Sequence, residues 1–68
     1  MMIKDFQKDF SKCAYNFKRI RLYGNGNVII FADDYEISDD QVVLIYGYHK
    51  VAYISADSIK AVCDMESD

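Results

Sequence analysis

The spacing of apolar residues changes at Lys18, and this change limits the folds open to the chain. Before Lys18 the apolar residues recur every three or four positions, and at about 100° per residue they share one face of a helix. After Lys18, Ile20 and Leu22 alternate with Arg19 and Arg21, which is the spacing of a β-strand. The sequence therefore predicts an amphipathic helix over residues 1–17 and β-structure after it. The apolar stripe of the helix comprises Ile3, Phe6, Phe10, Cys13, Ala14 and Phe17.

Short connections separate the strands that the rest of the chain predicts. Asn25-Gly26 lies between two apolar runs, and Asn-Gly is a strong hairpin signal because both residues tolerate positive φ. The acidic stretch 33–40 fits either a loop or the end of a long bent strand that turns at Asp39-Asp40. A reversal is expected at 47–50, and a short turn, with 3₁₀ geometry as one option, at Ala56-Asp57-Ser58. Strands are expected at 18–23, 28–32, 41–46, 51–55 and 59–63.

One helix followed by five strands with short connections is typical of a small barrel. We expect a mainly β (α+β) fold, in which an N-terminal amphipathic helix precedes a five-stranded antiparallel SH3-like barrel. At 68 residues the chain has room for one domain, with the helix at 1–17, the barrel at 18–63 and a frayed tail at 64–68. A hydrophobic fraction of 51% excludes an intrinsically disordered chain.

Cysteine usage and the distribution of charge predict a cytoplasmic chain. Cys13 and Cys63 are the only cysteines, and no charged-then-apolar leader precedes them. We therefore expect both residues to be structural, with no disulfide, in a reducing compartment. No uncharged stretch approaches the ~20 residues of a membrane span, so no membrane association is expected.

The strand predicted at 41–46 is apolar at successive positions, so one face of it must be covered. We place Val43 and Ile45 in the barrel, which leaves Val42, Leu44 and Tyr46 facing outward. Large exposed apolar patches are uncommon on soluble monomers, so either the helix or a neighbouring subunit covers that face. Tyrosine is enriched at binding surfaces and is also common in strands. The candidate interface, through which we expect self-association, consists of Val42, Leu44, Tyr46, Tyr48 and Tyr53.

Charge is divided unequally along the chain. Residues 1–21 carry six basic and two acidic side chains, a net +4, whereas residues 22–68 carry a net −7. Such asymmetry is typical of a charged partner or of head-to-tail association, and ordinary solvated surface also produces it. The candidate basic patch comprises Lys4, Lys8, Lys12, Lys18, Arg19 and Arg21, and the candidate acidic patch comprises Asp33, Asp34, Glu36, Asp39 and Asp40.

No motif supports catalysis, a metal site or a cofactor, and we expect none of the three. His49 is the only histidine, and no serine or cysteine can be placed beside it as a nucleophile. The acids in 33–40 lack the central glycine of a calcium loop, and one histidine with two distant cysteines is not a zinc signature. Gly24-Asn25-Gly26 precedes a strand rather than a helix, so it is interpreted as a turn and not as a phosphate-binding loop.

Four segments match the pattern of a known family. They are Ile-Arg-Leu-Tyr at 20–23 with the turn at 25–26, Val-Ile-Ile-Phe at 28–31, Val-Val-Leu-Ile-Tyr at 42–46, and the whole of 51–62. These segments resemble the Sm-like superfamily of small β-barrels, including its Hfq-type branch. The resemblance implies five strongly bent strands after an N-terminal helix, and rings in which strand four of one subunit pairs with strand five of its neighbour. The Hfq-type branch has Tyr-Lys-His where this chain has Ser55-Ala56-Asp57, so no RNA-binding residue is carried over.

The sequence thus predicts a small, non-catalytic protein-binding or assembly module that self-associates. Two alternatives stay open. One is an Sm-like protein that binds RNA or single-stranded nucleic acid through the basic patch, weakly because the rest of the chain is acidic. The other is an acidic inhibitor, of the kind that phages and mobile elements encode, which mimics nucleic acid through the acidic patch.

Overall fold

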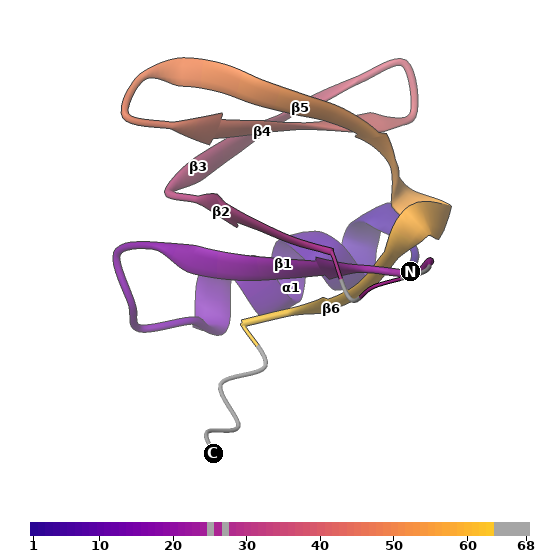
Figure 1. Cartoon of the computed structure of the whole chain (residues 1–68), viewed down its shortest axis with the longest axis horizontal. Helices are drawn as coiled ribbons and strands as arrows, with labels where there is room; N and C mark the ends of the chain where they lie inside the picture. The colour runs from indigo at the N-terminus through magenta and orange to yellow at the C-terminus, as the bar shows by residue number, and fades with distance from the viewer. Residues whose placement is uncertain (25, 27, 64–68) are drawn as a thin grey trace.

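Two small antiparallel sheets lie over one another, with one helix beside them (Figure 1). The computed structural model describes residues 1–24, 26 and 28–63, and these residues contain six strands. The first sheet has the strand order β2-β1-β6, and the second sheet has the order β3-β4-β5. The elements are α1 (Ile3–Lys12), β1 (Lys18–Leu22), β2 (Ile29–Ala32), β3 (Asp34–Ser38), β4 (Gln41–Tyr46), β5 (His49–Ser55), the 3₁₀ turn η1 (Ala56–Ser58) and β6 (Ile59–Val62).

The expected mainly β fold with one N-terminal helix is confirmed, but a closed five-stranded barrel is not observed. A kink at Asp33 divides the long second strand into β2 and β3, which belong to different sheets. The Asp33 N–H donates to the Ile45 carbonyl at 2.8 Å. Before Asp33 the chain pairs with β1, and after it the chain pairs with β4. Of the two interpretations of residues 33–40, the bent strand with a turn at Asp39-Asp40 is therefore confirmed.

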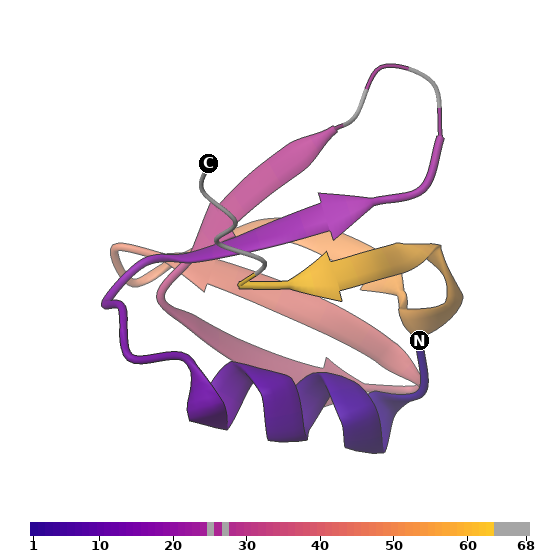
Figure 2. The same cartoon turned by 90° about the horizontal axis from the view of Figure 1, so that it is seen from below.

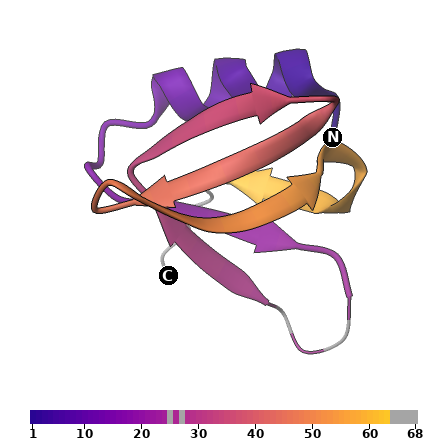
Figure 3. The same ribbon diagram turned by 90° about the horizontal axis from the view of Figure 1, so that it is seen from above.

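Helix α1 lies along the side of the molecule next to β3, as Figure 2 and Figure 3 show from opposite directions. Its buried face is narrower than the predicted stripe, because Phe6 and Phe10 are its only buried residues. Their rings approach Tyr35 of β3 at 5.0 and 4.7 Å between centroids, in edge-to-face geometry. Aromatic pairs prefer such tilted contacts, so these three rings fix the helix against the second sheet.

The two cysteines form a disulfide, and the expectation that the chain has none is wrong. Cys13 follows the last helical residue and Cys63 follows the last residue of β6, with Cα atoms 6.0 Å apart. Cys13 adopts an extended backbone (ψ 125°), so α1 ends at Lys12 and not at residue 17 as expected. In the chain-entropy description, a bond across a separation of 50 residues stabilises the fold by about 4 kcal/mol.

The core between the sheets contains the opposite face of β4 from the one that we expected. Val42 and Leu44 are fully buried in it, so they belong to the core and not to the candidate interface. The pairing register gives the reason, because these two residues lie opposite apolar partners on both neighbouring strands, whereas Val43 lies opposite Glu36 and Tyr53. A one-residue change of register exchanges the two faces of a strand. The partners of Val42 and Leu44 are Ile37, Tyr35, Ile54 and Ala52.

Two further expectations concern the ends of the chain and its turns. The tail at 64–68 and Asn25 of the expected hairpin turn lie outside the described residues. Gly26 has a φ of 89°, in the positive range that such a turn uses. Within the described part of the chain, every helix is too short or too polar to cross a membrane.

Candidate protein-interaction site

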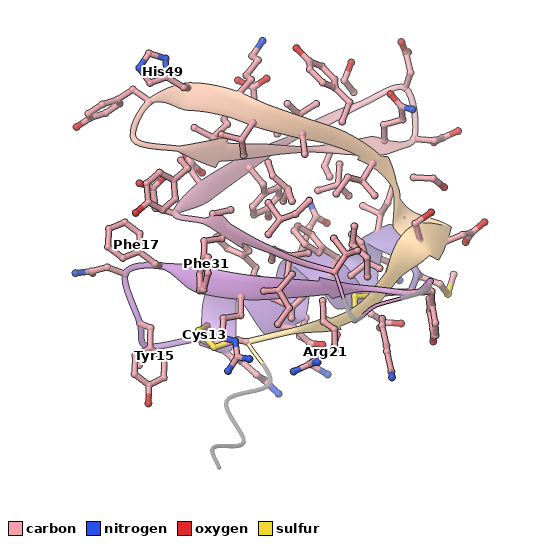
Figure 4. The ribbon with its side chains drawn as sticks, in the orientation of Figure 1. Cys13, Tyr15, Phe17, Arg21, Phe31 and His49 are labelled. Carbon is pink, nitrogen blue, oxygen red and sulfur yellow. A yellow bond between two sulfur atoms is a disulfide. The ribbon has the colours of Figure 1, made fainter. Side chains whose placement is uncertain are left out.

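Three aromatic side chains are exposed at the end of the molecule where the β4–β5 hairpin turns. The rings of Phe17 and Tyr46 stack with centroids 4.9 Å apart and an interplanar angle of 20°. Both are close to half exposed, Phe17 at 50% and Tyr46 at 41%, so the pair is only partly covered. Figure 4 shows Phe17 projecting outward at the left of the molecule. We call Phe17, Tyr46 and Tyr48 the aromatic end.

Tyr48 occupies a backbone conformation that a bulky residue rarely adopts. It forms a two-residue turn with Gly47, and the φ angles of Gly47 and Tyr48 are 60° and 71°. Such turns match the twist of the strands but favour Asn, Asp or Gly, as in the Asp39-Asp40 turn. Positive φ costs an ordinary residue about 1 kcal/mol. The Tyr48 side chain is 100% exposed, so no burial within the chain offsets that cost.

Asp33 holds the turn that presents Tyr48. Its carboxylate accepts a hydrogen bond from the Gly47 N–H at 3.1 Å, across 14 residues of sequence. The backbone of Asp33 is also bonded to Ile45, so the kink between β2 and β3 is tied to the end of β4 at two points. The aromatic end is thus presented by an anchored hairpin, and sequence reasoning assigned Asp33 only to the acidic patch.

The exposed surface extends from the aromatic end along β5, on the outer face of the second sheet. Tyr53 is 62% exposed and lies opposite Val43, which is only 1% exposed although alternation places it on the outer face. Lys50 of β5 reaches Glu36 of β3 at 3.8 Å between nitrogen and oxygen, and this ion pair spans β4. Of the predicted interface residues, Tyr46, Tyr48 and Tyr53 are therefore on the surface, and Val42 and Leu44 are not.

The predicted basic residues are distributed over three places. The helical lysines are exposed on α1, and the Lys18 ammonium instead lies over the Phe10 ring at 4.9 Å from its centroid. Arg19 and Arg21 extend to the outer face of the first sheet, because Ile20 between them is buried in the core. Figure 2 looks onto that face. The helical lysines are Lys4, Lys8 and Lys12.

The predicted acidic residues also fail to form one surface. Asp33 bonds to the β4–β5 turn, and the Asp34 carboxylate accepts the N–H of its neighbour Tyr35 at 2.8 Å. Glu36 pairs with Lys50. Asp39 and Asp40 form the turn at the far end of β3, where both have positive φ.

The described residues offer no arrangement for metal binding, since no three metal-ligating side chains gather among them. His49 begins β5 and is exposed, and Figure 4 places it on the opposite side of the molecule from Cys13.

Comparison with protein-family models, with curated proteins and with solved structures gives no significant match.

Proposed function

We propose that this chain is a small protein-binding module that self-associates through the aromatic end and the adjoining strand β5. Tyr48 is the observation that supports this most strongly. The residue strains the backbone, contributes no burial to the chain and sits on an anchored turn, two positions after Tyr46, whose half-exposed ring stacks on Phe17. Strained residues that do not serve packing are concentrated at binding sites. A fully exposed tyrosine also offers a partner a large, semi-rigid contact surface.

The free edge of β5 extends this surface. Within the described residues β5 pairs only with β4, so its other edge presents backbone groups available for pairing. The strand is seven residues long and contains no proline. Such edges readily pair with another chain. Val51 and Tyr53 on this strand are 49% and 62% exposed and would add side-chain contacts.

The SH3-like and Sm-like architecture is part of the proposal. We treat β2 and β3 as one bent strand, which reduces the six strands to five and makes the two sheets the halves of an open barrel. The short connection between β5 and β6, which consists of the 3₁₀ turn η1, supports this arrangement. In this arrangement β5 of one subunit would pair with β6 of the next, since both are sheet edges.

Size exclusion with light scattering tests self-association. At micromolar concentrations the chain should have a mass above the 7.9 kDa of one copy. The double variant Tyr46→Ser with Tyr48→Asn should return to the mass of a monomer. Tyr23→Ser is the control, because it removes a tyrosine that is 62% exposed and that follows the last residue of β1, whereas Phe17 precedes the first. A monomeric wild type, or a double variant that associates as strongly as wild type, would contradict the proposal.

Binding of single-stranded nucleic acid is a second candidate, and one contact favours it. Arg19 lies directly opposite Phe31, which is 51% exposed, on the outer face of the first sheet. A cation beside an exposed ring can hold a phosphate and stack a base. With Arg19 and Arg21 as the contacts, we expect weak binding whose affinity falls with salt with a logarithmic slope of about −1.4. Fluorescence anisotropy of a labelled oligonucleotide measures this affinity, and Arg19→Glu should abolish the binding while Lys4→Glu should not.

The acidic-inhibitor alternative has less support, because Asp33 and Glu36 already have partners within the chain.

A further inference from the structure

The Cys13–Cys63 disulfide lies at the surface beside an open cavity of about 450 Å³. Both cysteines are partly exposed and line this cavity, together with Lys12 and Tyr15. Figure 4 shows Cys13 and Tyr15 close together on the lower side of the molecule. Exchange of a disulfide requires that a thiolate can approach one of its sulfur atoms, and here the approach is open. Asp9 lines the same cavity as Lys12, so the charged side chains around the disulfide include one of each sign.

The disulfide controls the path of the chain toward the aromatic end. Between α1 and β1, residues 13–17 form neither helix nor strand, and all but Cys13 are exposed. This segment is held at its start by Cys13 and at its end by the Phe17–Tyr46 stack and the beginning of β1. Each cysteine also has a backbone hydrogen bond of its own. The Cys63 N–H donates to the Arg19 carbonyl at 2.7 Å, and the Cys13 N–H donates to the Phe10 carbonyl at 3.3 Å.

We propose that Cys13–Cys63 is a thiol–disulfide exchange site for a dithiol reductant, and that its reduction releases the aromatic end. A thiolate of the reductant attacks one sulfur, which forms a mixed disulfide and expels the other cysteine as a thiolate that takes up a proton. The second thiol of the reductant then displaces the first cysteine. Two electrons pass to the chain, which ends with two thiols, while the reductant becomes a disulfide.

Release follows from the loss of one of the restraints on the segment 13–17. After reduction Cys13 keeps its backbone hydrogen bond to Phe10 but is no longer tied to Cys63, so ordering Phe17 against Tyr46 costs more conformational entropy. The half-exposed stack has little burial with which to offset that cost. The strands keep their restraints, because β1 pairs with both β2 and β6 whatever the state of the bond. Regulation of association in this way rests on the proposed function, whereas exchange and release of Phe17 do not.

The test compares the oxidised chain with the chain treated with millimolar dithiothreitol, without denaturant. Intact mass and thiol labelling report exchange, and we expect two labelled thiols per chain. The cross-relaxation peak between the Phe17 and Tyr46 rings reports release, and we expect it to weaken severalfold. The amide chemical shifts of β4 and β5 indicate whether the second sheet stays folded, and we expect them to change little. Light scattering should show a lower mean mass for the reduced chain.

The variant Cys13→Ser with Cys63→Ser is the control. Its ring–ring peak and mean mass should equal those of the reduced chain and should not change when the reductant is added. A bond that resists the reductant in the folded chain would overturn the exchange site. A ring–ring peak that persists after reduction, or collapse of the β4 and β5 shifts, would overturn the local release of the aromatic end. If exchange and release occur but the oxidised chain is already a monomer, the proposed function fails while the redox site stands.

Discussion

Aromatic rings meet at two places in this molecule, and their surroundings differ. Beneath α1, Phe6 and Phe10 pack against Tyr35 at centroid distances of 5.0 and 4.7 Å, and both phenylalanines are buried. At the aromatic end, Phe17 and Tyr46 lie equally close at 4.9 Å, but both are close to half exposed. Ring proximity therefore does not distinguish a buried cluster from an exposed one, whereas the presence of a covering layer does.

The covering layer determines what each cluster contributes. The rings under α1 are enclosed by the helix and the second sheet, so their burial stabilises the fold of the single chain. Among the described residues the aromatic end has no such layer, and much of its apolar area is still in contact with water. That area is available to a second chain. The predictions below test this difference, beginning with the largest expected effect.

Truncating one ring in each cluster should give clearly unequal losses of stability. Phe6→Ala removes a fully buried ring and should lower the free energy of unfolding by about 3–5 kcal/mol. Phe17→Ala removes a half-exposed ring and should cost less than about 1.5 kcal/mol, the scale of one aromatic pair. Urea denaturation at low protein concentration measures both. Equal losses would mean that the two clusters are parts of one core.

Removing the Asp33 carboxylate should loosen the aromatic end without disturbing the rings under α1. Asp33→Ala breaks the hydrogen bond to the Gly47 N–H, and we expect a loss of about 1 kcal/mol. Amide exchange at Gly47 should accelerate, and the exchange of Phe10 in α1 should not. Asp34→Ala is the control, because among the described residues that carboxylate bonds to the N–H of its neighbour Tyr35 and not to the hairpin turn. Unchanged exchange at Gly47 would show that the turn does not depend on Asp33.

Relieving the backbone strain at Tyr48 should separate stability from association. Tyr48→Asn places a residue that tolerates positive φ in the turn, and the monomer should gain up to about 1 kcal/mol. Thermal denaturation at high dilution measures the gain, and light scattering at higher concentration should show weaker association. A variant less stable than wild type would indicate that Tyr48 serves the fold of its own chain.

The local elements could be predicted from the sequence because their signals are local. The helix followed from apolar spacing, and the turn at Asp39-Asp40 from two residues that tolerate positive φ. The orientation of β4 could not be predicted from that strand alone, since Val42 to Ile45 contains no polar residue to mark the outer face. Its partners hold the missing signal, because Glu36 lies opposite Val43.

The parts of the site that the sequence did not predict depend on contacts between distant residues. Cys13 and Cys63 are 50 positions apart, and only the docking of α1 beside β6 brings them together. The anchor from Asp33 to Gly47 spans 14 positions and depends on the kink between β2 and β3. Phe17 looked like the last residue of the helical stripe, and its exposure follows from the helix ending at Lys12.

A dilution series followed by amide chemical shifts tests the central claim most directly, because it maps association onto the two regions. We predict that resonances of residues 46–53, of Phe17 and of the pairing strand β6 move with protein concentration, whereas those of the lysine-bearing face of α1 stay fixed. The absence of any concentration dependence would contradict self-association. Shifts confined to α1, or to the outer face of the first sheet around Arg19, would contradict the assignment of the aromatic end as the contact surface.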